Sequence, residues 1–178
     1  MEEEKNVFSI ELLSALEIAK KIAKTNLNKY YSASHLLKAI LNRDLSLLKR
    51  LETMGKDVYY LDEWAEVRME EEPKTTNVLD AEPSDLIDEI IKEAESVRII
   101  LNEDEISLYA IMVAISSPGV GFNFDQMKSY PISRNELLED QVVIKYSPSR
   151  QVIVSSGRSA FNLLFKTDKI CAEISIGI

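Results

Sequence analysis

The sequence contains one cysteine, one histidine, five glycines and five prolines in 178 residues. The single cysteine, Cys171, excludes a framework of disulfides within the chain. The single histidine, His35, is accompanied by no cluster of Cys, His or Glu at the spacing of a metal site, and it lies in a different part of the chain from Cys171. The sequence therefore predicts no metal site, no catalytic residue and no cofactor, and it favours a structural His35 beside the apolar Leu36 and Leu37.

Basic residues are also scarce, since 21 Lys and Arg stand against 30 Asp and Glu, for a net charge of −9. Nucleic-acid binding needs clustered Lys and Arg, so we expect no nucleic-acid partner. No apolar run approaches the roughly 20 residues of a membrane span, and the acidic start MEEEKNVF does not resemble a signal peptide. We therefore expect a cytoplasmic protein that makes no contact with membranes.

The sequence also lacks the nucleotide-binding motif G-x-x-x-x-G-K-[ST]. The nearest approach is SSPGVGFNF at 116–124, where Phe122 occupies the place of the phosphate-binding lysine. The chain is thus predicted not to be an enzyme. We interpret this segment as a hinge-like turn between helices, in which Gly119 and Gly121 permit a backbone reversal and Phe122 and Phe124 pack.

What the sequence does contain is an internal repeat with a constant offset along the chain. Ser9 and Ser84 each precede an apolar pattern at helical spacing, and at the same offset Leu12 corresponds to Ile87. The correspondence continues without a gap to Ile40 and Ile115. Such a match in apolar and small residues indicates a diverged duplication.

Each repeat is predicted to form four helices. Ser9, Ser32 or Ser34, and Asp57 are expected to cap the first, second and fourth helices of repeat one, and Gly55 is expected to end the third. Expected helices of repeat two are 85–100, 107–116, 122–129 and 133–139. The predicted fold is all-α, with two four-helix repeats packed with approximate twofold symmetry. The predicted ranges are a domain over 1–140, made of repeat one (5–72), a linker (73–82) and repeat two (83–139), and then a tail (141–178).

The tail differs from the domain in charge and pattern. Residues 141–178 carry a net charge of +3, so residues 1–140 carry −12. Alternation of apolar and polar residues in QVVIKYSPSRQVIVSSGRSAFNLLF is typical of β-strands. We expect a short β-like or irregular tail, whose role the sequence does not indicate.

Residues 9–41 resemble the first repeat of Clp-type ATPase N-terminal domains. The resemblance rests on SASHLLKAI at 32–40 and extends through LETMGKDVYYL, and over roughly residues 5–139 in all. KDVYYLDEWAEVRMEEEP is most similar to the ClpV (TssH) branch, the unfoldase of type VI secretion systems. Nothing in the sequence matches the AAA+ modules of that family, which form hexamers.

The resemblance implies a domain that receives protein partners. In the ClpV branch, such a domain docks an N-terminal helix of a contracted-sheath subunit in a hydrophobic groove, so that the sheath is disassembled and recycled. In the ClpB- and ClpC-like branches, the domain recruits adaptors or unfolded substrates. Both functions remain open from the sequence, and the expected partner is a protein in either case.

A second apolar face on the first helix is the candidate binding site. The expected core face of this helix consists of Leu12, Leu16, Ala19, Ile22 and Ala23. Ile10, Leu13 and Ile18 point away from it, and their counterparts in repeat two are charged. This face is predicted either to pack against repeat two or to wall a peptide groove, with Phe8 as a further candidate.

Two other groups on the fourth helix have a structural and a functional interpretation. Tyr59, Tyr60 and Trp64 are predicted to pack in the core or to anchor a partner. The acidic residues before Pro73 are predicted to form a solvated helix end or a rim for a basic peptide.

Overall fold

The computed structural model describes residues 7–76 and 80–139, which all fall within one compact unit, Met1–Val143. Helices dominate these residues and the two strands are very short, so the fold is all-α as the sequence indicates. The predicted β-like tail at 141–178, including Cys171, lies outside the described residues.

Repeat one forms the four predicted helices. Ser9 begins the first, because its side chain accepts a hydrogen bond from the backbone N–H of Leu12 at 3.2 Å. Asp57 begins the fourth by accepting from Tyr60 at 2.9 Å. Gly55 follows the third helix with φ of 70°, a conformation that glycine adopts without strain. The elements are α1 (Ile10–Thr25), β1 (Tyr30–Tyr31), α2 (Ala33–Ile40), α3 (Ser46–Thr53) and α4 (Val58–Glu70).

Repeat two follows the same order with a shorter third helix. Its elements are β2 (Glu82–Pro83), α5 (Asp85–Leu101), α6 (Leu108–Ile115), α7 (Phe124–Met127) and a last helix at 134–139. The third helix was predicted over 122–129. The observed helix begins later, because the Asn123 side chain caps it by accepting from the backbone N–H of Gln126 at 2.9 Å, and it ends at Met127. None of the helices in the described part of the chain combines the length and apolar composition of a membrane span.

The constant offset of the sequence repeat recurs in the structure. α1 and α5 begin at Ile10 and Asp85, and α2 and α6 span Ala33–Ile40 and Leu108–Ile115. The backbone contacts between the repeats follow the same offset. Phe8 forms a parallel bridge with Ile106, and Pro83 pairs in parallel with Tyr31. The offset that carries Ile10 to Asp85 also carries Phe8 to Pro83 and Tyr31 to Ile106. Replacing each residue of the Phe8–Ile106 pair by its counterpart in the other repeat therefore gives the Pro83–Tyr31 pair. Such equivalent contacts are expected when two repeats pack with approximate twofold symmetry.

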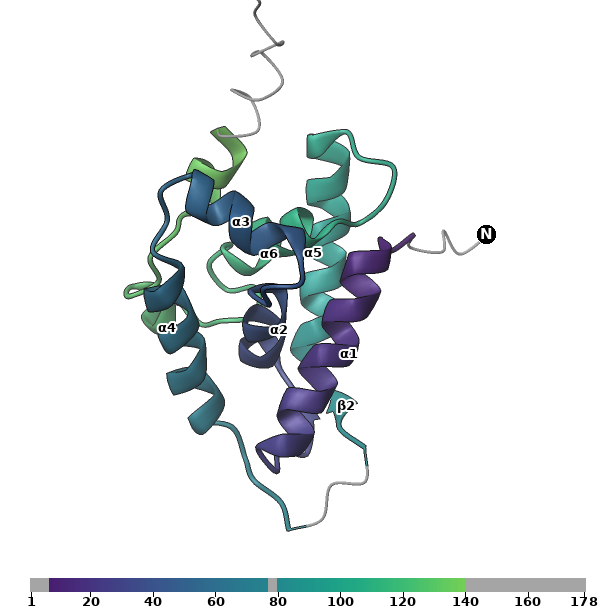
Figure 1. Ribbon diagram of the computed structural model, residues 1–178, viewed down its shortest axis with the longest axis vertical. Coiled ribbons are helices and arrows are strands. Elements are labelled where there is room, and N and C mark those ends of the chain that lie inside the picture. Colours follow the sequence, from purple (N-terminus) through teal and green to yellow (C-terminus); the bar gives the residue numbers. More distant parts are fainter. Residues whose placement is uncertain (1–6, 77–79, 140–178) are drawn as a thin grey trace, which may run out of the picture. The chain divides into compact units, whose positions relative to one another are not determined.

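The core lies along α2 and α6, which contact one another at the centre of the unit (Figure 1). Every residue of α6 is buried, and so is every residue of α2 except Lys38. α1 packs against α2, and α5 packs against α6 in the equivalent way. α4 also packs against α2, so that α1 and α4 flank this central helix on two sides (Figure 1).

The glycine-containing turn between α6 and α7 packs closely against both repeats. Gly121 has φ of 74°, and a Cβ at this position would lie 2.9 Å from Ile90 and 3.1 Å from Ala33. Glycine is therefore required both by backbone conformation and by close packing. Phe122 is buried as expected, but Phe124 is 71% exposed, so the expectation that both rings pack is wrong for Phe124.

Candidate functional site

A groove of about 880 Å³ lies on repeat one between α1 and α4. Its lining comes from all four helices and from the turn after α2. These residues are Ile18, Ile22, Lys38, Leu41, Asn42, Arg43, Asp44, Leu48, Glu52, Val58, Tyr59 and Asp62. In Figure 1, α1 and α4 lie on either side of α2, so the groove has a helical wall on each side.

The groove continues along the same two helices into a second depression of about 300 Å³. Its lining residues are Ile22, Asn26, Lys38, Glu66, Met69, Glu70 and Lys74. Ile22 and Lys38 line both depressions, so the two are neighbours along one concave surface. The larger one has the volume of a typical ligand site, about 300–1,000 Å³.

Lys38 separates the two depressions through a pair of ionic contacts. Its ammonium lies 2.5 Å from the carboxylate of Asp62 and 2.7 Å from that of Glu66. Burial works to lower the pKa of Lys38, but the hydrogen bonds that its ammonium donates to the carboxylates of Asp62 and Glu66 outweigh burial and raise the pKa. Lys38 is therefore held as a cation across the floor of the groove, with its side chain 24% exposed.

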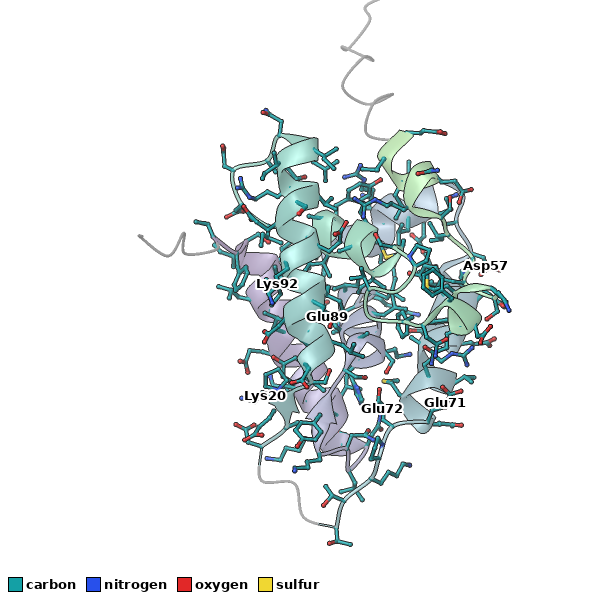
Figure 2. All side chains as sticks on the ribbon, turned by 180° about the vertical axis from the view of Figure 1, so that it is seen from behind. Lys20, Asp57, Glu71, Glu72, Glu89 and Lys92 are labelled. Atoms are coloured by element: carbon teal, nitrogen blue, oxygen red, sulfur yellow. The ribbon has the colours of Figure 1, made fainter. Side chains whose placement is uncertain are left out.

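The two walls of the groove differ in chemistry. Ile18 and Ile22 are one helical turn apart on α1 and make that wall apolar. On α4 the lining residues are Val58, Tyr59, Asp62, Glu66, Met69 and Glu70. The spacing of Asp62, Glu66 and Glu70 places these carboxylates along one face of the helix, and Val58 and Met69 add apolar surface near its two ends. Asp57 before α4 and Glu71 after it mark the two ends of this acidic wall (Figure 2).

The four residues expected to form a peptide-binding face are placed in three different surroundings. Ile18 lines the groove and packs partly against the core. Ile10 and Leu13 are 83% and 49% exposed on the outer side of α1, away from this groove. Phe8 packs partly against the core and bridges to Ile106 of repeat two. The structure thus brings only Ile18 of the four into the groove.

The exposure of Ile10 and Leu13 also corrects an expectation. Packing of this outer face against repeat two was one of the two interpretations of the sequence. The segment before α1 does contact repeat two, because Ser9 donates its backbone N–H to the Ile106 carbonyl at 3.1 Å. Beyond Ser9, α1 turns Ile10 and Leu13 toward solvent. These two residues therefore do not pack against repeat two.

Repeat two differs from repeat one at the position that matters for the groove. The counterpart of Ile18 is Glu93 on α5, and Glu93 forms an ion pair with Arg134 of the last helix. The counterpart of Lys38 is Val113, which is fully buried in α6. Ile18 in the apolar wall and the central cation Lys38 therefore have no equivalent in repeat two.

Sequence patterns indicated some groove residues and missed others. Ile22 was expected on the core face of the first helix, whereas it is partly exposed and lines the groove. Lys38 was missed, although a signal was present, because it is the one charged residue in the otherwise uncharged ASHLLKAI helix. A cation in such a helix indicates that this position reaches a surface with carboxylates nearby.

The aromatic residues of α4 divide between the two predicted roles. Trp64 is buried, and its ring meets those of Phe122 and Tyr130 edge-on at 4.7 and 4.9 Å. Its indole N–H donates to the hydroxyl of Ser129 at 3.0 Å. Tyr59 is 74% exposed and lines the groove. Core packing is thus confirmed for Trp64, while Tyr59 is placed where an anchor could act.

His35 has a structural role, as the sequence favoured. Its Nδ1 accepts from the backbone N–H of Ser32 at 3.1 Å, so Nε2 carries the proton and donates to Asn28 Oδ1 at 3.1 Å. Asn28 in turn donates to the carbonyls of Glu72 and Pro73, which ties the end of α4 to the start of α2. Burial lowers the pKa of His35 to about 4, so the ring is neutral near pH 7.

No group of three His, Cys, Asp or Glu side chains is arranged to hold a metal ion within residues 7–76 and 80–139. The acidic end of α4 contributes to local contacts instead. Glu71 pairs with Arg68 at 3.3 Å, and the Glu72 carbonyl accepts from Asn28. The groove thus has an apolar wall on α1, a row of carboxylates on α4 and a central cation at Lys38.

Comparison with known proteins gives a family and a fold. The family model "Clp repeat (R) N-terminal domain" matches residues 7–124. No curated protein sequence matches the chain significantly.

Solved structures of similar fold include N-terminal domains of two kinds of Clp ATPase. The Hsp104 N-terminal domain from Candida albicans is 13% identical with a TM-score of 0.64, covering 80% of this chain and 94% of that chain. The ClpV N-domain from Vibrio cholerae is 18% identical with a TM-score of 0.64, covering 80% of this chain and 87% of that one. A complex of a ClpV N-domain with a VipB peptide is 19% identical with a TM-score of 0.60, covering 80% and 89%.

Proposed function

The chain belongs to the family of Clp repeat N-terminal domains, and on that premise we propose that it binds a helix of a protein partner in the groove between α1 and α4. The observation that carries the proposal is the concave surface of about 880 Å³ with an apolar α1 wall. A second support is that the fold of this chain is similar to that of a ClpV N-domain in complex with a VipB peptide. An amphipathic helix would place its apolar face against Ile18 and Ile22.

The finer form of the proposal concerns the type VI secretion system. In this form the domain belongs to a ClpV-like AAA+ chaperone and receives a helix of the contracted-sheath protein, so that the sheath is disassembled and recycled. The support is the resemblance of KDVYYLDEWAEVRMEEEP to that branch and the ClpV N-domains among the similar structures. The setting of this function is the cytoplasm, where ring-forming ATPase modules would act on the bound partner.

A second function is favoured by a different observation. The Hsp104 N-terminal domain has the same TM-score, 0.64, as the Vibrio cholerae ClpV N-domain. On this alternative the domain recruits adaptors or unfolded substrates to a ClpB- or ClpC-like unfoldase. A pull-down with the tagged chain separates the two, because recovered sheath subunits support the first function and recovered adaptors or mixed unfolded chains support the second.

We propose no catalytic role for this chain under either function. The sequence contains no G-x-x-x-x-G-K-[ST] motif. The groove presents carboxylates, an amide, cations and apolar side chains, without histidine or cysteine among its lining residues. ATP turnover by the pure chain would contradict this assignment.

Two isoleucines on α1 provide a matched test of the groove. Ile18→Ala removes apolar contact from the groove, while Ile10→Ala makes the same change at a residue that is 83% exposed and lies elsewhere. With a labelled helical peptide from a sheath subunit, we expect Ile18→Ala to weaken binding by roughly tenfold, since burying such a side chain is worth about 1.5–3 kcal/mol. We expect Ile10→Ala to bind like the wild type in fluorescence anisotropy.

The same titration tests the outer face of α1 that the sequence indicated. Leu13→Asp places a charge on that face, at a residue that is 49% exposed. Loss of binding in Leu13→Asp and Ile10→Ala, with Ile18→Ala unaffected, would transfer the site from the groove to the outer face. Circular dichroism of each variant serves as the control that the fold is retained.

A further inference from the structure

The charges that line the groove are unbalanced. Five carboxylates and three cations line its two depressions. Two of the carboxylates, Asp62 and Glu66, share the single ammonium of Lys38. Their side chains remain 39% and 55% exposed, so both can still be reached from the groove.

The carboxylates of α4 form a row along one side of the groove. Asp62, Glu66 and Glu70 follow one another at every fourth position along α4, which gives a row of carboxylates parallel to the groove. The residues of α1 that line the groove are the apolar Ile18 and Ile22. A helix lying in the groove therefore meets apolar side chains on one edge and carboxylates on the other.

Resting on the function proposed above, we propose that the groove selects an amphipathic helix with Lys or Arg along one edge of its apolar face. These cations pair with the carboxylates of α4, and Lys38 competes with them for Asp62 and Glu66. An acidic helix would meet the same row of carboxylates and be repelled. The net charge of the whole chain, −9, adds long-range attraction for a basic partner.

The competition gives Lys38 a role that differs from that of a purely structural ion pair. Removing Lys38 frees two carboxylates for the ligand, so a basic helix gains affinity. If Lys38 served only to hold α2 against α4, its loss would loosen the groove and weaken every ligand. The sign of the change therefore separates the two roles.

The test uses three synthetic peptides that share one apolar face and carry Lys, Gln or Glu along one edge. Their binding to the whole 178-residue chain is measured by fluorescence anisotropy at low and high salt. We expect the Lys peptide to bind about tenfold more tightly than the Glu peptide, because it can form two or three exposed ion pairs where the Glu peptide meets like charges. The preference should shrink as NaCl rises from about 50 to about 300 mM.

Lys38→Met is the informative variant, and Lys92→Met is its matched control. Both remove one positive charge, but Lys92 lies on α5, which lines neither depression (Figure 2). We expect Lys38→Met to raise the affinity for the Lys peptide about threefold relative to that for the Gln peptide, since only the Lys peptide can pair with the two freed carboxylates. Lys92→Met should bind all three like the wild type.

The outcomes distinguish failure of this inference from failure of the proposed function. Equal binding of the three peptides to the wild type would overturn the charge selection and leave the groove as a binding site. If none of the three peptides binds, the proposal that the groove is a binding site would itself be overturned. If Lys38→Met does not fold, Asp62→Asn with Glu66→Gln replaces it, with an expected loss of the preference for the Lys peptide; a retained preference would overturn the inference.

Discussion

Ser9 donates its backbone N–H to the carbonyl of Ile106 at 3.1 Å, which fastens the start of repeat one to repeat two. The duplicated bond runs from Ser84 to the carbonyl of Tyr31 at 3.0 Å. The backbone contacts are thus equivalent in the two repeats. The side chains of the two serines are not, because Ser9 accepts a capping bond from Leu12 while Ser84 makes no capping bond.

This difference predicts that Ser9→Ala destabilises the fold and that Ser84→Ala does not. Loss of the Ser9 cap should lower the free energy of unfolding by about 1 kcal/mol. Ser84→Ala removes a buried hydroxyl that has no hydrogen-bond partner, so it should change that free energy by less than about 0.5 kcal/mol. Urea unfolding followed by circular dichroism measures both, and equal losses would show that the serine caps contribute alike.

The buried, neutral His35 predicts that stability falls in mild acid. Its pKa is about 4 in the folded chain and 6.5 when unfolded, so the unfolded chain binds the extra proton between these values. The free energy of unfolding should therefore be lower at pH 4.5 than at pH 7, by an amount on the order of 3 kcal/mol for the full shift. No other histidine is present to titrate in this range.

The control for this prediction is His35→Gln, which keeps a polar side chain but cannot titrate. Glu95 and Glu136 also have lowered pKa values, since Glu95 accepts hydrogen bonds from Arg98, and Glu136 from the Ser133 backbone and from Lys56. Their contribution to stability is lost below about pH 4.5, and it is common to both proteins. The difference between wild type and variant over pH 4.5–6.5 isolates His35. A difference that does not change with pH would contradict its burial as a neutral ring.

Two glycines with similar backbone conformation predict different effects of alanine. Gly55 and Gly121 have φ of 70° and 74°, so alanine is strained by about 1 kcal/mol at both. A Cβ at Gly55 meets nothing within 4 Å, whereas one at Gly121 would overlap Ile90 and crowd Ala33. Thermal unfolding should show Gly121→Ala to be less stable than Gly55→Ala by about 1–3 kcal/mol. Equal melting temperatures would mean that the repeats separate easily at this turn.

Two phenylalanines in the same segment predict a similar contrast. Phe122 is buried against Trp64, and Phe124 is 71% exposed. Phe122→Ala should lower the free energy of unfolding by about 3–5 kcal/mol, while Phe124→Ala should change it by less than about 0.5 kcal/mol. Trp64 is the single tryptophan, so its fluorescence reports directly on the loss of the neighbouring ring. A red-shifted emission is expected in Phe122→Ala only.

The local features of this protein were determined by its sequence. Ser9 and Asp57 cap helices where the pattern placed them, and the constant offset between the repeats recurs in the helix boundaries and in the bridges that join them. Helix periodicity and capping depend on residues within about four positions of one another, so they can be read directly along the chain. The resemblance in residues 9–41 also identified the family correctly.

The groove was decided only by tertiary structure. Ile18 and Ile22 on α1 line it together with Asp62 and Glu66 on α4, far along the chain, because both helices pack on α2. Periodicity on α1 shows which side is apolar, but it cannot show where a neighbouring helix stops covering that side. Ile10 and Leu13 were therefore indistinguishable from Ile18 in the sequence. The packing of α1 and α4 on the two sides of α2 makes Ile18 a groove residue and leaves the other two in solvent.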